Sequence, residues 1–98
     1  MATDVHVNCS KKRGDQYDPH ERIQGLGGVH GGQRWYMEES AIIAELEKPE
    51  ETRHWRFYTS VSHCFAWVVV ASHDGRKYLK TQADSYSPDN LLTLPNCP

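Results

Sequence analysis

The fold class follows from residues 66–81, AWVVVASHDGRKYLKT. Two runs rich in β-forming residues flank Asp74-Gly75, a dipeptide typical of tight hairpin turns. The sequence therefore predicts a β-hairpin with arms at residues 63–72 and 76–82. Because strands joined by a tight turn must run antiparallel, the hairpin also indicates an antiparallel sheet.

Two registers are compatible with this turn, and they point opposite faces of the valine run toward the core. A two-residue type I′ turn places Val70 beside Leu79, whereas a bulged three-residue loop places Val69 there. We favour the bulged loop, because His73-Asp74 suits an ordinary type I turn. This register predicts that Val69 and Leu79 are buried and that the outward side chains are Val68, Val70 and Tyr78.

The rest of the chain predicts further strands and one helix. Alternating apolar residues indicate strands near residues 3–9, 21–26, 34–37 and 53–61. A helix is expected from Glu38 to about Lys48, ended by Pro49, with its glutamates, Glu45 included, in water. Residues 11–15 read as a solvated turn and residues 25–32, GLGGVHGG, as a flexible loop between strands.

These elements predict an α+β fold of two layers, in the order β-β-α-β-β-β. An antiparallel sheet of about five strands would carry one helix on one face. Residues 1–98 are expected to form a single domain with its core at about 20–95, together with a strand at 3–9 and a C-terminal tail at 96–98. The expected core residues are Trp35, Tyr36, Ile42, Ile43, Leu46, Trp55, Phe57, Phe65, Trp67, Val68, Val69, Val70, Leu79, Leu91 and Leu92.

Composition excludes some classes of protein and indicates a compartment. A net charge of −2 argues against a general polyanion binder. The longest apolar run, residues 65–71, is far shorter than the ~20 residues of a membrane-spanning helix, so no membrane association is expected. The three cysteines have no CxxC spacing and no apolar signal segment follows Met1. We therefore expect a reduced, cytoplasmic chain.

The C-terminal third carries a family resemblance. Tyr78-Leu79, Asp84, 89–92 (DNLL) and Leu94-Pro95 resemble a family of small bacterial and phage proteins catalogued as domain of unknown function 3892. Residues 22–25 and Trp35, which leads into 40–42, resemble its earlier elements at comparable spacing. The resemblance implies the fold but no activity. We expect the motif residues to be structural: Trp35, Tyr78, Leu79, Asp84, Asn90, Leu91 and Pro95.

No motif in the sequence indicates catalysis or a bound cofactor. The glycine-rich segment lacks the Gly-Lys-Ser/Thr of a phosphate-binding loop. No nucleophile–base or paired-carboxylate pattern is present, so we expect a protein that is not an enzyme. Six histidines and three cysteines leave a metal site as an alternative, although their spacing does not favour one. Such a site could use His6, Cys9, His63 and Cys97.

Residues 53–58, RHWRFY, interleave cations and aromatics on a predicted strand. We expect Trp55 and Phe57 to face the core, and His54, Arg56 and Tyr58 to lie on the uncovered face of the sheet. With Tyr78, this face would bind a protein partner or a second copy of the chain. The alternative is single-stranded nucleic acid, because such binders combine cations with stacking aromatics on a sheet.

Overall fold

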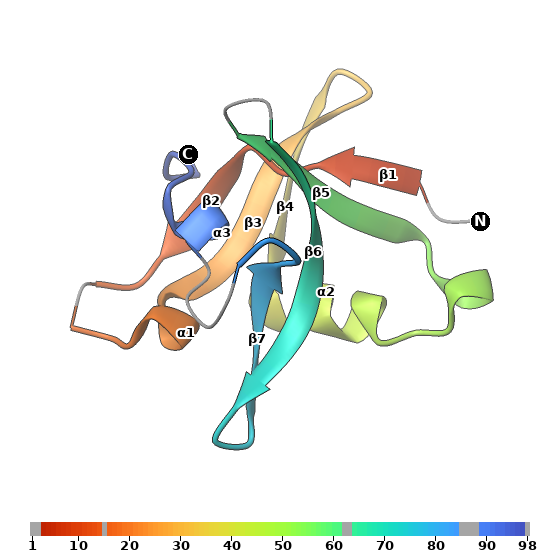
Figure 1. The fold of residues 1–98 in the computed structure, drawn as a ribbon. Helices are drawn as coiled ribbons and strands as arrows, with labels where there is room; N and C mark the ends of the chain where they lie inside the picture. Colours follow the sequence, from red (N-terminus) through yellow and green to blue (C-terminus); the bar gives the residue numbers. More distant parts are fainter. Residues whose placement is uncertain (1–2, 15, 62–63, 85–88, 98) are drawn as a thin grey trace.

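Two twisted sheets and one main helix make up the computed structural model, which describes residues 3–14, 16–61, 64–84 and 89–97 (Figure 1). The larger sheet has the order β1-β5-β6-β7 and consists of β1 (Thr3–His6), β5 (Trp55–Val61), β6 (Cys64–His73) and β7 (Arg76–Thr81). The smaller sheet consists of β2 (Cys9–Lys12), β3 (Ile23–His30) and β4 (Gln33–Glu38). The helical elements are α1 (Pro19–Arg22), α2 (Glu39–Leu46), the 3-10 turn η1 (Glu50–Thr52) and α3 (Asp89–Leu92).

The α+β class with one main helix is confirmed, but the strands are divided between two sheets. The division arises at residues 7 and 8, inside the strand that the sequence predicted at 3–9. The amide of Val7 donates to Tyr58 of the larger sheet at 2.8 Å, and the next amide, Asn8, donates to Gly27 of the smaller sheet at 3.0 Å. Lys11 and Lys12, expected in a turn, therefore extend β2. All strand pairs are antiparallel except β1 and β5, which are parallel.

The β6–β7 hairpin adopts the register that we did not favour. His73 pairs with Arg76 and Val70 with Leu79, so the loop has two residues. Asp74 and Gly75 have φ angles of 50° and 79°, as both central residues of a type I′ turn require. The bulged form is wrong because the type I′ turn matches the twist of the strands and aspartate tolerates the left-handed region. As a result Val68 lies in the core.

The glycine-rich segment is a strand, not the flexible loop that its composition predicted. Residues 25–30 lie in β3, at the centre of the smaller sheet, where the first glycines are buried, and Gly31 and Gly32 form the turn to β4. A Cβ atom on Gly28 would lie 2.5 Å from the carbonyl oxygen of His6 in β1. A Cβ atom on Gly27 would lie 3.0 Å from the sulfur of Cys9. Glycine is therefore needed here because other backbone and side-chain atoms approach the strand closely.

The core lies between the sheets and beneath α2, which contacts strands of both sheets. Phe57 is its largest residue, at 1% exposure, and Leu91 and Leu94 close one end. The expected core aromatics Tyr36, Trp55 and Phe65 are instead exposed, Phe65 to 56%. The buried apolar cluster consists of Val5, Val7, Ile23, Leu26, Ile42, Phe57, Val68, Leu79, Leu91 and Leu94.

Glu45 anchors α2 to the start of β5 and is not solvated as we expected. Its buried carboxylate accepts hydrogen bonds from the amide of His54 and, at 3.1 Å, from that of Trp55. The Lys48 ammonium lies 2.9 Å from its other oxygen. Burial alone raises the pKa of Glu45, but these three hydrogen bonds outweigh it and the pKa lies below its usual value.

The two phenylalanines of the chain provide a matched test of this core. We expect Phe57→Ala to lower the free energy of unfolding by about 3–5 kcal/mol, because it leaves a large cavity. Phe65→Ala removes the same atoms from an exposed site and should cost less than about 1 kcal/mol. Urea unfolding followed by circular dichroism measures both values. Equal losses for the two variants would contradict the assignment of faces.

Glu45→Gln should lower stability by about 1–3 kcal/mol at pH 7, because the amides of His54 and Trp55 lose an ionised acceptor. The pKa of Glu45 is lower in the folded protein than its unfolded value of about 4.3, so its carboxylate stabilises the fold fully above that unfolded value. This contribution is lost as the pH falls through the pKa of the folded state. The difference between wild type and variant should therefore shrink below about pH 4 in urea titrations. The exposed Glu50→Gln is the control, and a pH-independent difference would refute this role.

Candidate functional site

A row of aromatic rings covers the outer face of the larger sheet, on the side opposite the core. Side chains alternate along each strand, so β5 turns Phe57 inward and its neighbours Arg56 and Tyr58 outward. The strand registers place His6 of β1 and Trp67 of β6 on either side of Tyr58. We call this surface the aromatic face, and it consists of His6, Arg56, Tyr58, Phe65 and Trp67.

The rings of the aromatic face contact one another across three strands. The centroids of His6 and Tyr58 are 5.1 Å apart with an interplanar angle of 16°, and Tyr58 also stacks on Phe65 at 5.1 Å. Phe65 and Trp67 meet edge to face at 5.0 Å. Such contacts hold the rings in fixed positions, so the face is a preformed apolar surface.

Arg56 supplies the positive charge of this face, and it is already engaged. Its guanidinium lies 4.6 Å from the centre of the Trp67 ring. It also donates two hydrogen bonds to the Asp4 carboxylate, at 3.0 and 2.7 Å. Because the Asp4 carboxylate offsets the charge of its guanidinium, Arg56 is not a free anion site. Its main contribution to the face is to orient the Trp67 ring.

The structure brings together only part of the surface that the sequence predicted. Arg56 and Tyr58 lie side by side in the aromatic face. His54 precedes β5 and its ring lies near Trp55, at 6.1 Å, outside the row. Tyr78 is only 3% exposed, so its expected place on an open surface is corrected. His6 belongs to the row but was missed, since its strand pairing is not visible in the sequence.

Phe65 and Trp67 were assigned to the core because they are large and apolar. The alternation of Phe65, Ala66 and Trp67 was the available signal, since only one of its two faces can be buried. In the structure Ala66 and Val68 point inward, and the two aromatic residues point outward. Residue size therefore misled the assignment, because the period of two shows that Phe65 and Trp67 share a face but not which face is buried.

The family motif forms a polar network at the end of β7. The Asp84 carboxylate accepts hydrogen bonds from the amide and hydroxyl of Thr81, at 3.1 and 3.0 Å, and from the Asn90 amide at 3.3 Å. The Asn90 side chain donates to the Thr81 hydroxyl at 2.9 Å. These bonds position α3, so that Leu91 enters the core.

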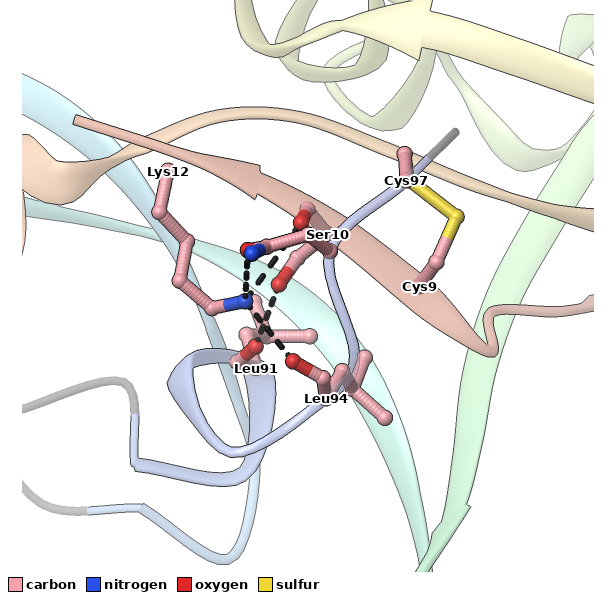
Figure 2. The surroundings of a disulfide bond; sticks show 7 residues. Cys9, Ser10, Lys12, Leu91, Leu94 and Cys97 are labelled. Atoms are coloured by element: carbon pink, nitrogen blue, oxygen red, sulfur yellow. Dashed lines mark hydrogen bonds between the residues drawn. A yellow bond between two sulfur atoms is a disulfide. The ribbon is translucent and has the colours of Figure 1, made fainter.

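Hydrogen bonds hold the C-terminal segment 89–97 against β2 (Figure 2). Ser10 is completely buried; its hydroxyl donates to the Leu91 carbonyl at 2.8 Å and its amide to the Pro95 carbonyl at 2.9 Å. The Lys12 ammonium donates to the Leu94 carbonyl at 2.7 Å. Burial and the nearby Arg22 lower the pKa of Lys12.

A disulfide between Cys9 and Cys97 completes this attachment and corrects the expectation of reduced cysteines (Figure 2). The pairing follows from the adjacency of β2 and the C-terminal segment, which no sequence spacing indicated. A bonded pair cannot act as thiolate ligands, so the metal site that included Cys9 and Cys97 is not formed. His63, its third member, lies outside the described residues. In the described part of the chain no three His, Cys, Asp or Glu side chains gather to hold a metal.

These features define a small two-sheet α+β domain with an aromatic sheet face and a fastened C-terminal segment. The chain belongs to the family described as "Protein of unknown function (DUF3892)", whose model matches residues 5–95. The match confirms the resemblance carried by the C-terminal motif. No curated protein and no solved structure matches the chain. Among the residues that the structure describes, no helix is long and apolar enough to cross a membrane.

We expect Cys97→Ser to lower the free energy of unfolding by about 2–4 kcal/mol, because the disulfide closes a long loop in the unfolded chain. The bond spans 88 residues of sequence. A reductant should lower the stability of the wild type to the same level and leave the variant unchanged. Alkylation followed by mass spectrometry gives an independent measurement. Modification of all three cysteines without a reductant would contradict the pairing.

Proposed function

We propose that this protein is a non-catalytic binding module whose aromatic face binds a protein partner, a second copy of the chain included. The contiguous row of His6, Tyr58, Phe65 and Trp67 supports this most directly. Phe65 contributes nothing to the buried core yet is a large apolar residue in water. Contiguous apolar surfaces of this kind are typical of interaction sites.

The chemistry of the aromatic face favours protein over nucleic acid. Tyrosine, tryptophan and arginine are the residues that most often dominate protein interfaces. Binding to a polyanion depends instead on several unpaired cations. Arg56 is paired with Asp4, and Lys80, on the same face of the sheet, donates to the carbonyls of Thr81 and Asp84.

Single-stranded nucleic acid remains the second candidate. Its support is the row of aromatic rings on a sheet surface, because single-strand binders use such side chains to stack bases. This candidate requires Arg56 to exchange Asp4 for a phosphate group.

The cytoplasmic location expected from the sequence is likewise a proposal, and the Cys9–Cys97 disulfide argues for an oxidising environment instead.

The test compares wild type with the double variant Tyr58→Ala and Phe65→Ser. Sedimentation velocity at 5–200 µM, a range of about 40-fold chosen to include typical weak self-association, measures dimer formation. Affinity purification from the native host with quantitative mass spectrometry measures other protein partners. We expect the association constant of the double variant to be at least about tenfold lower than that of the wild type, because the two substitutions remove the centre of the aromatic face. Tyr17→Ser, an exposed aromatic outside the face, is the matched control.

The same protein samples separate the two candidates. Fluorescence anisotropy with a labelled single-stranded oligonucleotide should show no binding at low salt if the partner is a protein. Binding that weakens with added salt and with Arg56→Ala would support nucleic acid instead. A monomer that retains no partner and binds no oligonucleotide, or equal behaviour of the double variant and Tyr17→Ser, would refute the aromatic face as a binding site.

A further inference from the structure

The two edges of the smaller sheet differ in how they are covered. Along β2 the C-terminal segment occupies the edge, because the Ser10 amide donates to Pro95 and its carbonyl accepts from Cys97. Along β4 no described strand or loop does the same, and β3 is the only described strand with which β4 pairs. β4 contains no proline or lysine, and its register with β3 is continuous. An edge without these protective features can pair with a strand of another chain.

The backbone groups of every second residue in β4 point away from β3. Opposed residues of an antiparallel pair alternate between hydrogen-bonded and non-hydrogen-bonded pairs. Gly27 lies opposite Tyr36 but directs its carbonyl to the other side, where the Asn8 amide donates to it at 3.0 Å. The Gly27–Tyr36 pair is therefore a non-hydrogen-bonded one, and the N–H and C=O of Tyr36 point outward. The same holds for Arg34 and Glu38, which lie two residues away on either side.

The side chains of these three residues share one face of β4 and are exposed, Tyr36 to 41%. The Arg34 guanidinium makes no hydrogen bond or ion pair with any described residue. The Glu38 carboxylate accepts a hydrogen bond from the Tyr36 hydroxyl and has further lone pairs to offer. A positive charge, an aromatic ring and a negative charge therefore follow one another along the open edge.

This order is complementary to itself when two copies of β4 run antiparallel. With a two-fold axis at Tyr36, Arg34 of each copy lies opposite Glu38 of the other. These are hydrogen-bonded pairs, because the outward amides of Tyr36 and Glu38 donate to the carbonyls of Tyr36 and Arg34 in the other copy. Oppositely charged cross-strand pairs stabilise a sheet. A parallel, in-register arrangement would instead place like charges side by side.

We propose that this protein forms a symmetric dimer in which β4 pairs with β4 of a second copy, so that the two smaller sheets become one. On the other face of β4, Trp35 and Met37 line a hollow together with Trp55. In the dimer Trp35 lies opposite Met37 of the other copy, which adds apolar contact along the same strand pair. An interface of this size is small, so we expect a dissociation constant of about 10 µM to 1 mM.

The dimer is independent of the proposed binding function. The aromatic face belongs to the larger sheet, whereas β4 belongs to the smaller one. The dimer therefore leaves Tyr58 and Phe65 free for a partner. Either proposal can fail without the other, because the variants that test them lie in different sheets.

The experiment exchanges charges across the strand pair and measures dimerisation of the full-length protein by sedimentation velocity at up to about 1 mM. Arg34→Glu and Glu38→Arg each place like charges opposite one another, and each should weaken the dimer roughly 5- to 30-fold. An equimolar mixture of the two variants regains both ion pairs in a heterodimer and should recover the affinity of the wild type. A folding defect would not be repaired by mixing. Glu50→Arg, the same change at an exposed residue outside the edge, is the matched control.

Amide hydrogen exchange followed by NMR tests the register. A higher protein concentration should slow exchange at the amides of Tyr36 and Glu38 and leave those of Trp35 and Met37, which already bond to β3, unchanged. A monomer at about 1 mM, or weak association that the mixture does not recover, would overturn the inference. A dimer that is lost in Tyr58→Ala and Phe65→Ser but kept in the β4 variants would overturn it as well, and would place self-association on the aromatic face.

Discussion

The close approach of the two sheets where β1 passes into β2 is the constraint on which the rest of the structure depends. Between Val7 and Asn8 the backbone changes its hydrogen-bonding partner from β5 to β3. This change is possible because Gly28 has no side chain to collide with the carbonyl oxygen of His6. The two sheets can then share one core that includes Val5, Val7 and Leu26.

This arrangement also decides how the aromatic residues are used. Each strand of the larger sheet has one face toward the core and one toward solvent, and the core takes Phe57. Tyr58, Phe65 and Trp67 are left on the outside, where they pack against one another. The separation of the sheets at their open end leaves Trp35 and Trp55 around a hollow. One packing constraint thus creates two different surfaces.

The family motif contributes at the end of the core that Leu91 and Leu94 close. Asp84 and Asn90 are held by a network around the buried Thr81, and Leu91 and Leu94 seal the apolar cluster. Ser10 and Lys12 of β2 bind the backbone of the C-terminal segment. The disulfide adds a covalent link between the same two parts of the chain. The contacts of these motif residues are therefore internal ones, and the aromatic face contains none of them.

The sequence by itself determined the features that depend on local residue patterns. These are the α+β class, a helix within residues 38–48, the Asp74-Gly75 turn, and the family indicated by residues 78–95. Tertiary structure decided the features that depend on residues far apart in the chain. The glycine-rich segment GLGGVHGG forms a strand because β1 and Tyr36 approach it closely. Glu45 is buried because the amides at the start of β5 bind its carboxylate. The side on which Phe65 and Trp67 lie, and the pairing of Cys9 with Cys97, follow in the same way from strand registers set by the whole core.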